Sequence, residues 1–397
     1  MPKKSSKTAL FVTILRVFAY SNWFLPQIKT SRIYIVMRLF YANKKLKAIC
    51  SFLFCILCIA FVVFSPTYIF DKERYSLSLN KYLSSTQAKD VVLSLYHVET
   101  FEGGTASRSK YLEKMAQRFN RLYSNCYIVV KTISQDELVL NIEKDNIPDM
   151  LSFGTGAGEY IAGFMAELEK NKNVRSDLAT LGTKGGKILA YPYMLSGYAL
   201  ISKQSLDEGE NDISKLLEPN KNSKKTIKGV SIGMENTNPC KVLAQKGIKS
   251  NKENAGVFDS QYDAYCSFVR GESVSLLGTA RDVHRIKKRE QNGTIPTCSY
   301  YYFGTYSDLV QYIGVSTKSI KNLEYCKLFA TFLTQEESQQ AIKNYGLFSV
   351  RDTKIYTENY MNEFEDALMG HISSFSAFSS LSDIKSIQKV TFDAIFE

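Results

Sequence analysis

Residues 91–153 read VVLSLYHVETFEGGTASRSKYLEKMAQRFNRLYSNCYIVVKTISQDELVLNIEKDNIPDMLSF, and short apolar runs alternate in them with helix-like segments. The apolar runs, two of them rich in β-branched residues, predict strands at Val91–Tyr96, Tyr127–Thr132 and Pro148–Phe153. Between them, apolar residues recur at helical spacing in Lys110–Tyr123, and Asp136–Asn146 gives a second, mixed helical signal. Strands that alternate with helices are typical of a parallel α/β sheet.

The alternation of strands and helices continues toward the carboxyl terminus. Further strands are expected at Ile188–Tyr193, Gly197–Ser202, Gly229–Gly233, Val274–Gly278, Tyr300–Phe303 and Val310–Val315. Further helices are expected at Ser260–Arg270, Asp282–Gln291, Leu323–Leu333 and Glu336–Tyr345. Residues 71–397 provide enough chain for two lobes, each with its own core.

An uncharged apolar segment precedes this pattern. Ala48–Phe64 reads AICSFLFCILCIAFVVF and has 17 residues, which is at the lower limit for crossing a hydrocarbon core. Pro66 argues for a helix end near Ser65. A buried core helix is the alternative, but such helices usually show a polar stripe and this segment shows none. We therefore expect a transmembrane or signal-anchor helix at residues 48–65 and a stalk at 66–89.

Positive charge is concentrated before the apolar segment. Residues 1–49 contain ten Lys or Arg and no Asp or Glu, whereas the rest of the chain holds 40 basic and 39 acidic residues. Basic residues mark the cytoplasmic side of a membrane helix. We therefore expect residues 1–47 to be a cytoplasmic tail and the large domain to be extracellular, tethered to the cell membrane. The net charge of +11 then requires no nucleic-acid partner.

The layout of the amino-terminal region gives two further expectations. Met37 begins a conventional secretory layout, which favours it as the start of translation, with residues 1–36 then untranslated; Met1 is the alternative start. Cys50, Cys55 and Cys58 each follow a bulky residue, whereas a lipid-modified cysteine needs a small residue before it. Because the small-residue cleavage site after the apolar run is also poor, an uncleaved single-pass anchor is expected.

Side chains that could carry catalysis or hold a metal are sparse. His97, His284 and His371 do not stand at metal-ligand spacing from one another or from Cys, and His97 is interpreted as structural or ligand-contacting. No catalytic triad or carboxylate pair has local support, so we expect no enzyme activity, cofactor or metal. The exterior cysteines are odd in number and widely spaced, which leaves room for one disulfide but not a dense framework: Cys126, Cys240, Cys266, Cys298 and Cys326.

Glycine-rich loops follow two of the predicted strands. Gly154–Gly158 reads GTGAG, which lacks the GxGxxG spacing of a dinucleotide site, and Gly103-Gly104-Thr105 stands at the equivalent end of the first strand. Ligands of open α/β sheets bind at the carboxyl ends of strands, so both loops are candidates to hold a polar ligand. Thr279 and Arg281 follow a later strand in the same way. Ordinary turns are the alternative.

Tyrosines cluster where the chain is expected to cross between lobes. Tyr191, Tyr193 and Tyr198 lie within eight residues of one another. Aromatic rings often recognise the apolar faces of sugars, but the alternative, packing in a core or an interface, is more frequent.

Several stretches of the chain, taken in order, resemble those of a known family. They include FEGG, PDMLSFGTG, ILAYPYMLSGYALI, GESVSLLGTARD, YSDLVQYIGV, FATFLTQEESQQAI and YGLFSV, and they extend from Val91 to Val350. The chain resembles the extracellular solute-binding proteins of ABC importers, in particular those of Gram-positive, clostridia-like bacteria. The resemblance is an overall pattern of weak motifs. The chain departs from the typical Gram-positive member, a lipoprotein, in having no lipobox.

This resemblance implies a two-lobed α/β fold of the periplasmic-binding-protein-like type II, with a hinge and a ligand held between the lobes. It assigns residues 90–198 and 304–397, including the C-terminal helices, to the first lobe and residues 199–303 to the second. Carried over residue by residue, it implies ligand contacts from Glu102, Gly103, Thr105, Arg108, Phe153, Gly154, Thr155, Tyr193, Tyr198, Thr279 and Arg281.

The function that the resemblance implies is that of a receptor. It would deliver a carbohydrate or another small polar solute to an ABC permease in the membrane. A sensor or scaffold ectodomain that signals to a membrane partner is the first alternative, and the uncleaved anchor favours it. A surface hydrolase is the weaker alternative, because it needs a catalytic constellation that the sequence does not offer.

Overall fold

The computed structural model of the chain describes residues 91–99, 107–205, 212–219 and 227–397. All of them belong to one compact unit, Lys89–Glu397, and a separate unit, Met1–Ala88, precedes it. The predicted tail, membrane anchor and stalk, residues 1–89, lie outside the described residues. Within the described ranges, none of the helices has both the length and the apolar character needed to cross a bilayer.

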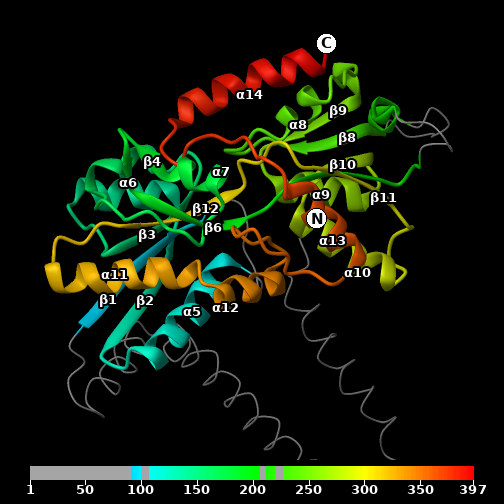
Figure 1. Cartoon of the computed structure of the whole chain (residues 1–397). Coiled ribbons are helices and arrows are strands. Elements are labelled where there is room, and N and C mark those ends of the chain that lie inside the picture. Colours follow the sequence, from blue (N-terminus) through cyan, green and yellow to red (C-terminus); the bar gives the residue numbers. More distant parts are fainter. Residues whose placement is uncertain (1–90, 100–106, 206–211, 220–226) are drawn as a thin grey trace, which may run out of the picture. The chain divides into compact units, whose positions relative to one another are not determined.

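Five strands form the first sheet, in the order β2-β1-β3-β12-β6 (Figure 1). Their bounds are β1 Val91–Val98, β2 Cys126–Ile133, β3 Met150–Gly154, β6 Ala190–Leu195 and β12 Val310–Val315. β1 runs parallel to β2 and to β3, whereas β12 is antiparallel to β3 and to β6. The three parallel strands confirm the predicted alternation of strands and helices.

Helices cover the first sheet and begin at serine caps. α5 (Arg108–Leu122), α6 (Gln135–Glu143) and α11 (Ile320–Leu333) follow serines whose hydroxyls accept backbone N–H groups of the first turn. These caps satisfy N–H groups that have no partner within the helix. Smaller elements complete this half: α7 (Ser176–Ala179), β4 (Thr183–Lys184), β5 (Lys187–Ile188), α12 (Glu336–Gln340) and η7 (Ala341–Tyr345), with short 3₁₀ turns at η2 (Gly158–Tyr160), η3 (Ala162–Phe164) and η4 (Thr180–Gly182).

The second sheet has the order β11-β7-β10-β8-β9. Its strands are β7 Tyr198–Ser202, β8 Lys228–Gly233, β9 Ala255–Phe258, β10 Ser273–Thr279 and β11 Ser299–Phe303. β8 is parallel to β9 and β10, and β7 is antiparallel to β10 and β11. Around this sheet lie η5 (Ile213–Leu217), α8 (Cys240–Gln245), η6 (Lys252–Asn254), α9 (Gln261–Arg270) and α10 (Ala280–Gln291).

Alternating residues of β7 belong to two different apolar clusters. Ala199 and Ile201 belong to the larger cluster, which also contains the core of the first sheet, whereas Tyr198 and Leu200 belong to the smaller one. Successive side chains of a strand point to opposite faces, so a strand buried on both faces reads as a continuous apolar run. The predicted run at Gly197–Ser202 is therefore a central strand, with a neighbour on each side.

Two short segments carry the chain between the sheets. Ser196 and Gly197 separate β6 from β7, and residues 304–309 separate β11 from β12. Gly304 is in close contact with the backbone, because a Cβ there would lie 1.7 Å from the carbonyl oxygen of Ala367. Only glycine fits such an approach. The two sheets are thus connected by two crossings, and the hinge stays a prediction.

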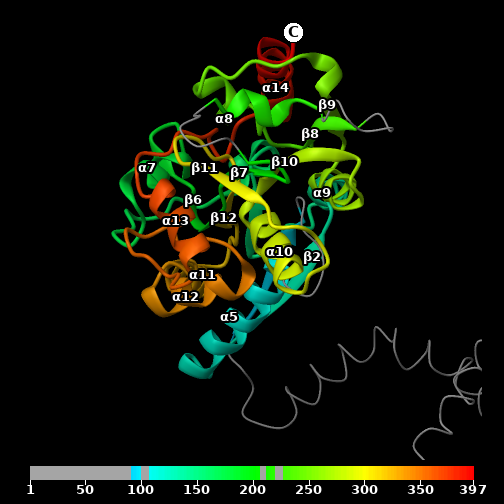
Figure 2. The same ribbon diagram turned by 90° about the vertical axis from the view of Figure 1, so that its right-hand side faces the viewer.

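The chain ends in two helices, α13 (Asn359–Leu368) and α14 (Leu381–Ile395). α13 packs on β11, and α14 packs on α8 beside the second sheet, as both views show (Figures 1 and 2). The predicted grouping of these helices with the first lobe stays a prediction, since α14 contacts elements of both halves. The five cysteines of the described residues are all free thiols.

Candidate functional site

The structure places the predicted site residues in three situations. Glu102, Gly103 and Thr105 lie in residues 100–106, outside the described part of the chain. The remaining predicted residues are all buried. They lie at or just after the end of β3, within β6, at the start of β7, at the end of β10 and on the first turns of α5 and α10: Arg108, Phe153, Gly154, Thr155, Tyr193, Tyr198, Thr279 and Arg281. Four of these eight residues join one of two buried polar networks: Arg108, Thr155, Tyr193 and Tyr198.

The first network connects four strands of the first sheet to the start of α5. The Arg108 guanidinium donates to Gln311 Oε1 at 2.8 Å, and Gln311 Nε2 donates to Ser152 Oγ at 3.1 Å. Ser152 Oγ lies 2.8 Å from the Tyr193 hydroxyl and 2.9 Å from His97 Nδ1. All five side chains are buried, so these bonds offset the cost of removing polar groups from water.

His97 is held neutral by this environment. Burial, together with the nearby Arg108 charge, lowers the pKa of His97 to about 3. The imidazole therefore carries no charge at physiological pH, and it has a fixed hydrogen-bond partner in Ser152. These features support the interpretation of His97 as a structural or ligand-contacting residue.

The second network is centred on Asp308, in the segment that returns the chain to the first sheet. Its carboxylate accepts hydrogen bonds from the Tyr198 hydroxyl at 2.6 Å, the Tyr306 hydroxyl at 2.9 Å and the Asn238 N–H at 2.6 Å. Its carbonyl oxygen accepts from Thr155 Oγ1 at 3.0 Å. Asp308 therefore connects the loop after β3 with β7 and with the turn after β8. We call these five residues the junction.

The electrostatics of the junction are dominated by burial. Burial raises the pKa of the Asp308 carboxyl, although the three donors favour its charged form. Burial and the Asp308 charge also raise the pKa of Tyr198 and of Tyr306, whose rings stack 6.5 Å apart. Both phenols therefore stay protonated at neutral pH, and their O–H groups donate to Asp308.

Thr279 and Arg281 lie where β10 gives way to α10. The Thr279 N–H and hydroxyl both donate to the Asp282 carboxylate, which forms a capping box at the start of the helix. Arg281 is buried, and its Cγ lies 3.6 Å from the point that a Cβ on Gly346 would occupy. Gly346 has a φ of +68° and ends η7 in the first half, so the start of α10 approaches the first half there.

Sequence reasoning missed the turn after β8. Asn236 Nδ2 donates to Gln135 Oε1 of α6 at 3.2 Å, and Asn238 enters the junction. It also missed Asp308, Ser152 and Gln311, although YSDLVQYIGV and PDMLSFGTG contain them. The first of these motifs did contain a signal. Asp308 stands between Tyr306 and an apolar strand, and a carboxylate at such a position is expected to be buried.

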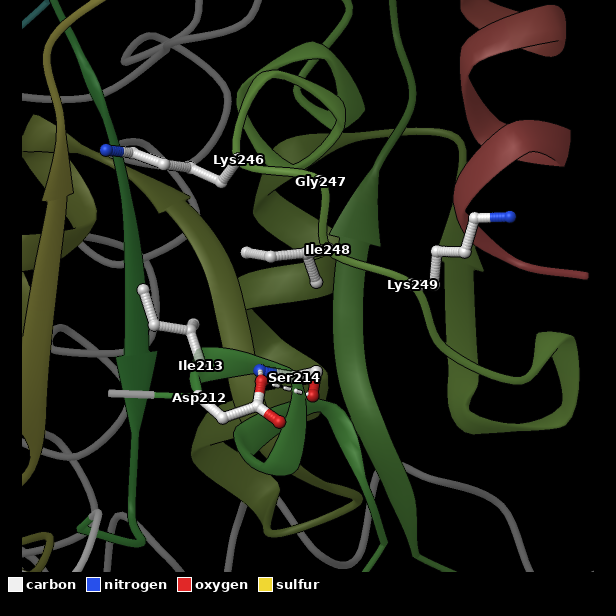
Figure 3. A pocket seen from close by; sticks show the side chains of 7 residues that line it. All are labelled: Asp212, Ile213, Ser214, Lys246, Gly247, Ile248 and Lys249. Atoms are coloured by element: carbon white, nitrogen blue, oxygen red, sulfur yellow. Dashed lines mark hydrogen bonds between the residues drawn. The ribbon is translucent and has the colours of Figure 1, made fainter. Parts of the chain in front are cut away.

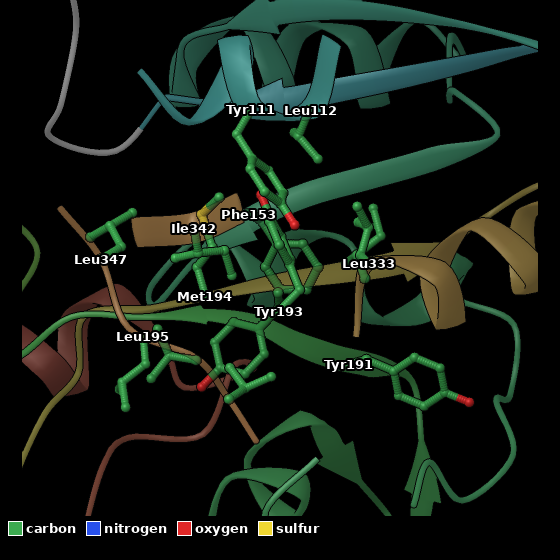
Figure 4. Packing of buried hydrophobic residues seen from close by; sticks show 14 of the residues in the cluster. Tyr111, Leu112, Phe153, Tyr191, Tyr193, Met194, Leu195, Leu333, Ile342 and Leu347 are labelled. Atoms are coloured by element: carbon green, nitrogen blue, oxygen red, sulfur yellow. The ribbon is translucent and has the colours of Figure 1, made fainter. Parts of the chain in front are cut away.

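Phe153 and Tyr193 lie in the core of the first half. Phe153 packs against Tyr312 and Phe378, with ring centroids 5.9 and 6.0 Å away. Tyr193 stacks on Tyr111 of α5 at 6.2 Å, and Figure 4 shows the side chains of this cluster between α5 and β6. Both residues are fully buried in this structure. Their role in ligand contact stays a prediction.

A pocket of about 570 Å³ lies elsewhere, on the second half. It is lined by Asp212–Ser214 of η5 and Lys246–Lys249 after α8 (Figure 3). Asp212 already caps η5 by accepting from Ser214, and the amino groups of Lys246 and Lys249 point away from the pocket in opposite directions. The predicted residues Thr155, Tyr198 and Thr279 lie instead at the junction and at the ends of β3 and β10, so we take these ends, the carboxyl end of β8 and the junction as the candidate site.

Two mixed sheets joined by two crossings define the two-lobed type II fold of periplasmic binding proteins, as the sequence analysis predicted. No protein-family model and no curated protein sequence matches the chain. Solved structures of this fold do match it. They include maltose-bound MalE3 of T. maritima, which is 14% identical with a TM-score of 0.56 and covers 76% of this chain and 99% of that one.

Two other solved structures show how widely the fold is used. The ABC substrate-binding protein Lmo0181 of Listeria monocytogenes, in complex with cycloalternan, is 15% identical, with a TM-score of 0.51 over 77% of this chain and 100% of that one. Iron-bound HitA of Pseudomonas aeruginosa is 15% identical, with a TM-score of 0.52 over 76% and 99%. At these identities the likeness establishes the fold alone, and the bound molecules named are those of the other proteins.

Proposed function

We propose that this chain is an extracellular solute-binding receptor that delivers a carbohydrate or another small polar solute to an ABC permease. Residues 48–65 would tether it to the membrane in a single pass. The observation that carries the proposal is the pair of sheets joined by two crossings, with polar residues gathered where the carboxyl ends of their strands meet. Ligands of such folds bind between lobes that move about a hinge, without covalent chemistry.

The solute would lie between the carboxyl edges of the two sheets. Glu102, Gly103 and Thr105 follow β1, and Arg281 starts α10 on the opposite half. Two features support a polar ligand here: hydrogen-bonding side chains are common at these edges, and the Asn236–Gln135 hydrogen bond brings the two halves together there. The sugar complexes among the similar structures favour carbohydrates as the first class to test.

A ligand screen by thermal unfolding tests the proposal. The purified full chain is heated with sugars, amino acids, peptides and metal ions in separate wells. A solute that binds only the folded state at 100 times its Kd stabilises it by about 2.7 kcal/mol, which raises the Tm by several degrees. If no compound in any class raises the Tm, the receptor proposal fails.

Arg281→Ala tests the location of the site. Arg281 is buried at the start of α10, whereas Arg289, on the same helix, is exposed and serves as the matched control. We expect Arg281→Ala to weaken solute binding at least tenfold and Arg289→Ala to leave the affinity unchanged. Equal affinities for the two variants would place the site away from the start of α10.

A further inference from the structure

The turn at residues 236–238 is held from one side by α14. Gln388 Nε2 donates to the Thr237 carbonyl oxygen at 2.6 Å, and Asn238 Nδ2 donates to Thr391 Oγ1 at 3.2 Å. On its other sides the same turn bonds Gln135 of α6 and Asp308 of the junction. The turn is therefore hydrogen-bonded to the first half, to the junction and to the last helix of the chain.

The two α14 residues that hold the turn occupy positions that packing alone would give to apolar side chains. The buried face of α14 consists of Ile384, Gln388, Thr391 and Ile395, which follow helical spacing. Gln388 and Thr391 are each only 7% exposed. Burying such groups costs free energy unless they are hydrogen-bonded, and both of them bond the turn.

α14 is itself fixed at both ends. Near its start, Leu381 Cδ1 and Ile384 Cδ1 lie 3.4 and 3.6 Å from the point that a Cβ on Gly156 would occupy, in the loop after β3. At its end, Ser250 N–H donates to the Ile395 carbonyl oxygen at 2.8 Å. The helix therefore contacts the first half at its start, the second half at its end and the turn in between.

We propose that α14 positions the 236–238 turn at the edge of the solute site, with Gln388 and Thr391 as positioning residues for binding. The role in binding rests on the proposed receptor function, because the turn lies at the carboxyl end of β8. On this proposal the position of the Asn236 amide at the site is set by the hydrogen bonds from α14 to the turn, and not by β8 alone. Neither residue needs to touch the solute.

Amide hydrogen exchange of the full chain in D₂O tests the positioning without any solute. The variants are Gln388→Leu and Thr391→Val, which keep the approximate size of each side chain and remove its hydrogen bond. Ile395→Val is the matched control, since it weakens the packing of α14 without touching the turn. Thr391→Ser keeps the hydroxyl and serves as the rescue variant.

We expect each of the two hydrogen-bond variants to speed exchange at residues 236–238 about fivefold, since a net hydrogen bond contributes on the order of 1 kcal/mol. Thr391→Ser should restore the slow rate, and Ile395→Val should leave the turn at the wild-type rate. If Gln388→Leu and Thr391→Val exchange no faster at the turn than Ile395→Val, the positioning proposal is wrong.

Maltose titration of the same variants extends the test to binding. If the wild type binds maltose, Gln388→Leu should weaken its affinity about fivefold and Ile395→Val should not. Equal affinities would overturn the role in binding. If the wild type does not bind maltose, the exchange result still decides whether α14 positions the turn, and only the choice of solute is contradicted.

Discussion

Replacing Asp308 would separate the contribution of its hydrogen bonds from that of its charge. Asp308→Ala removes the acceptor of three buried donors, whereas Asp308→Asn keeps the shape. In the Asn variant, the amide oxygen can still accept from Asn238 N–H and the Tyr306 hydroxyl, and the amide N–H₂ can donate to the Tyr198 oxygen. The two variants therefore differ in hydrogen bonds and agree in having no charge.

The expected magnitudes follow from the geometry of the junction. Each buried donor left without a partner costs about 1–3 kcal/mol, and removing the charge recovers part of the cost of burying a carboxylate. We expect Asp308→Ala to lower the free energy of unfolding by about 3 kcal/mol and Asp308→Asn to change it by about 1 kcal/mol or less. Urea denaturation of the full chain measures both values.

The difference in stability between the wild type and Asp308→Asn should also depend on pH. Because burial raises the folded-state pKa of Asp308, the folded state binds the proton more tightly than the unfolded state does. The resulting stabilisation is complete below the unfolded pKa of about 3.9 and is lost as the pH rises through the folded pKa. The wild type should therefore lose stability relative to Asp308→Asn as the pH rises from about 4 to 7. A flat difference, or equal stability of the Ala and Asn variants, would refute this account of the junction.

The remaining predictions concern the crossing and the first network. Gly304→Ala should lower the free energy of unfolding by more than about 3 kcal/mol, because its Cβ would meet the Ala367 carbonyl. Gly370→Ala is the control and should cost under about 1 kcal/mol, because the space around Gly370 is open. Similar urea midpoints for the two variants would contradict the close approach at Gly304. His97, with its pKa lowered to about 3, should destabilise the fold as the pH falls from about 6.5 toward 3. His97→Asn should remove that part of the acid sensitivity, and an NMR titration that showed protonation of His97 near pH 6 would contradict the lowered pKa.

The strands and most helices were predictable because each depends on a local pattern. Val91–Val98 and Cys126–Ile133 carry β-branched residues in short runs, and α5 shows one apolar face. The exceptions are the two-residue strands β4 and β5 and the strand β9, whose four residues include a glycine; all three are too short to give a signal. The local pattern of residues was therefore enough to predict the fold class. β9 could be identified only in the structure, from its parallel pairing with β8.

The candidate site was less predictable because its contacts are distant in sequence. Asp308 bonds Tyr198 across 110 positions and Asn238 across 70. Tyr193 and Tyr198 were both named from their position near the crossing, but the sequence could not indicate that one enters the core and the other binds a carboxylate. Gln388 and Thr391 carried a weak signal, as polar residues in an apolar stripe, and the sequence did not show what they hold.

The order of strands in the first sheet has a consequence for how the chain folds as it is made. All strands of the second sheet come from residues 198–303, so that sheet can form as soon as this stretch has emerged. The first sheet must wait, because β12 pairs with both β3 and β6 and is synthesised after all of them. Until β12 arrives, β3 and β6 each have an open edge, and open edges invite mispairing. The first half is therefore the part of the chain that is most exposed to mispairing until residues 310–315 have been made.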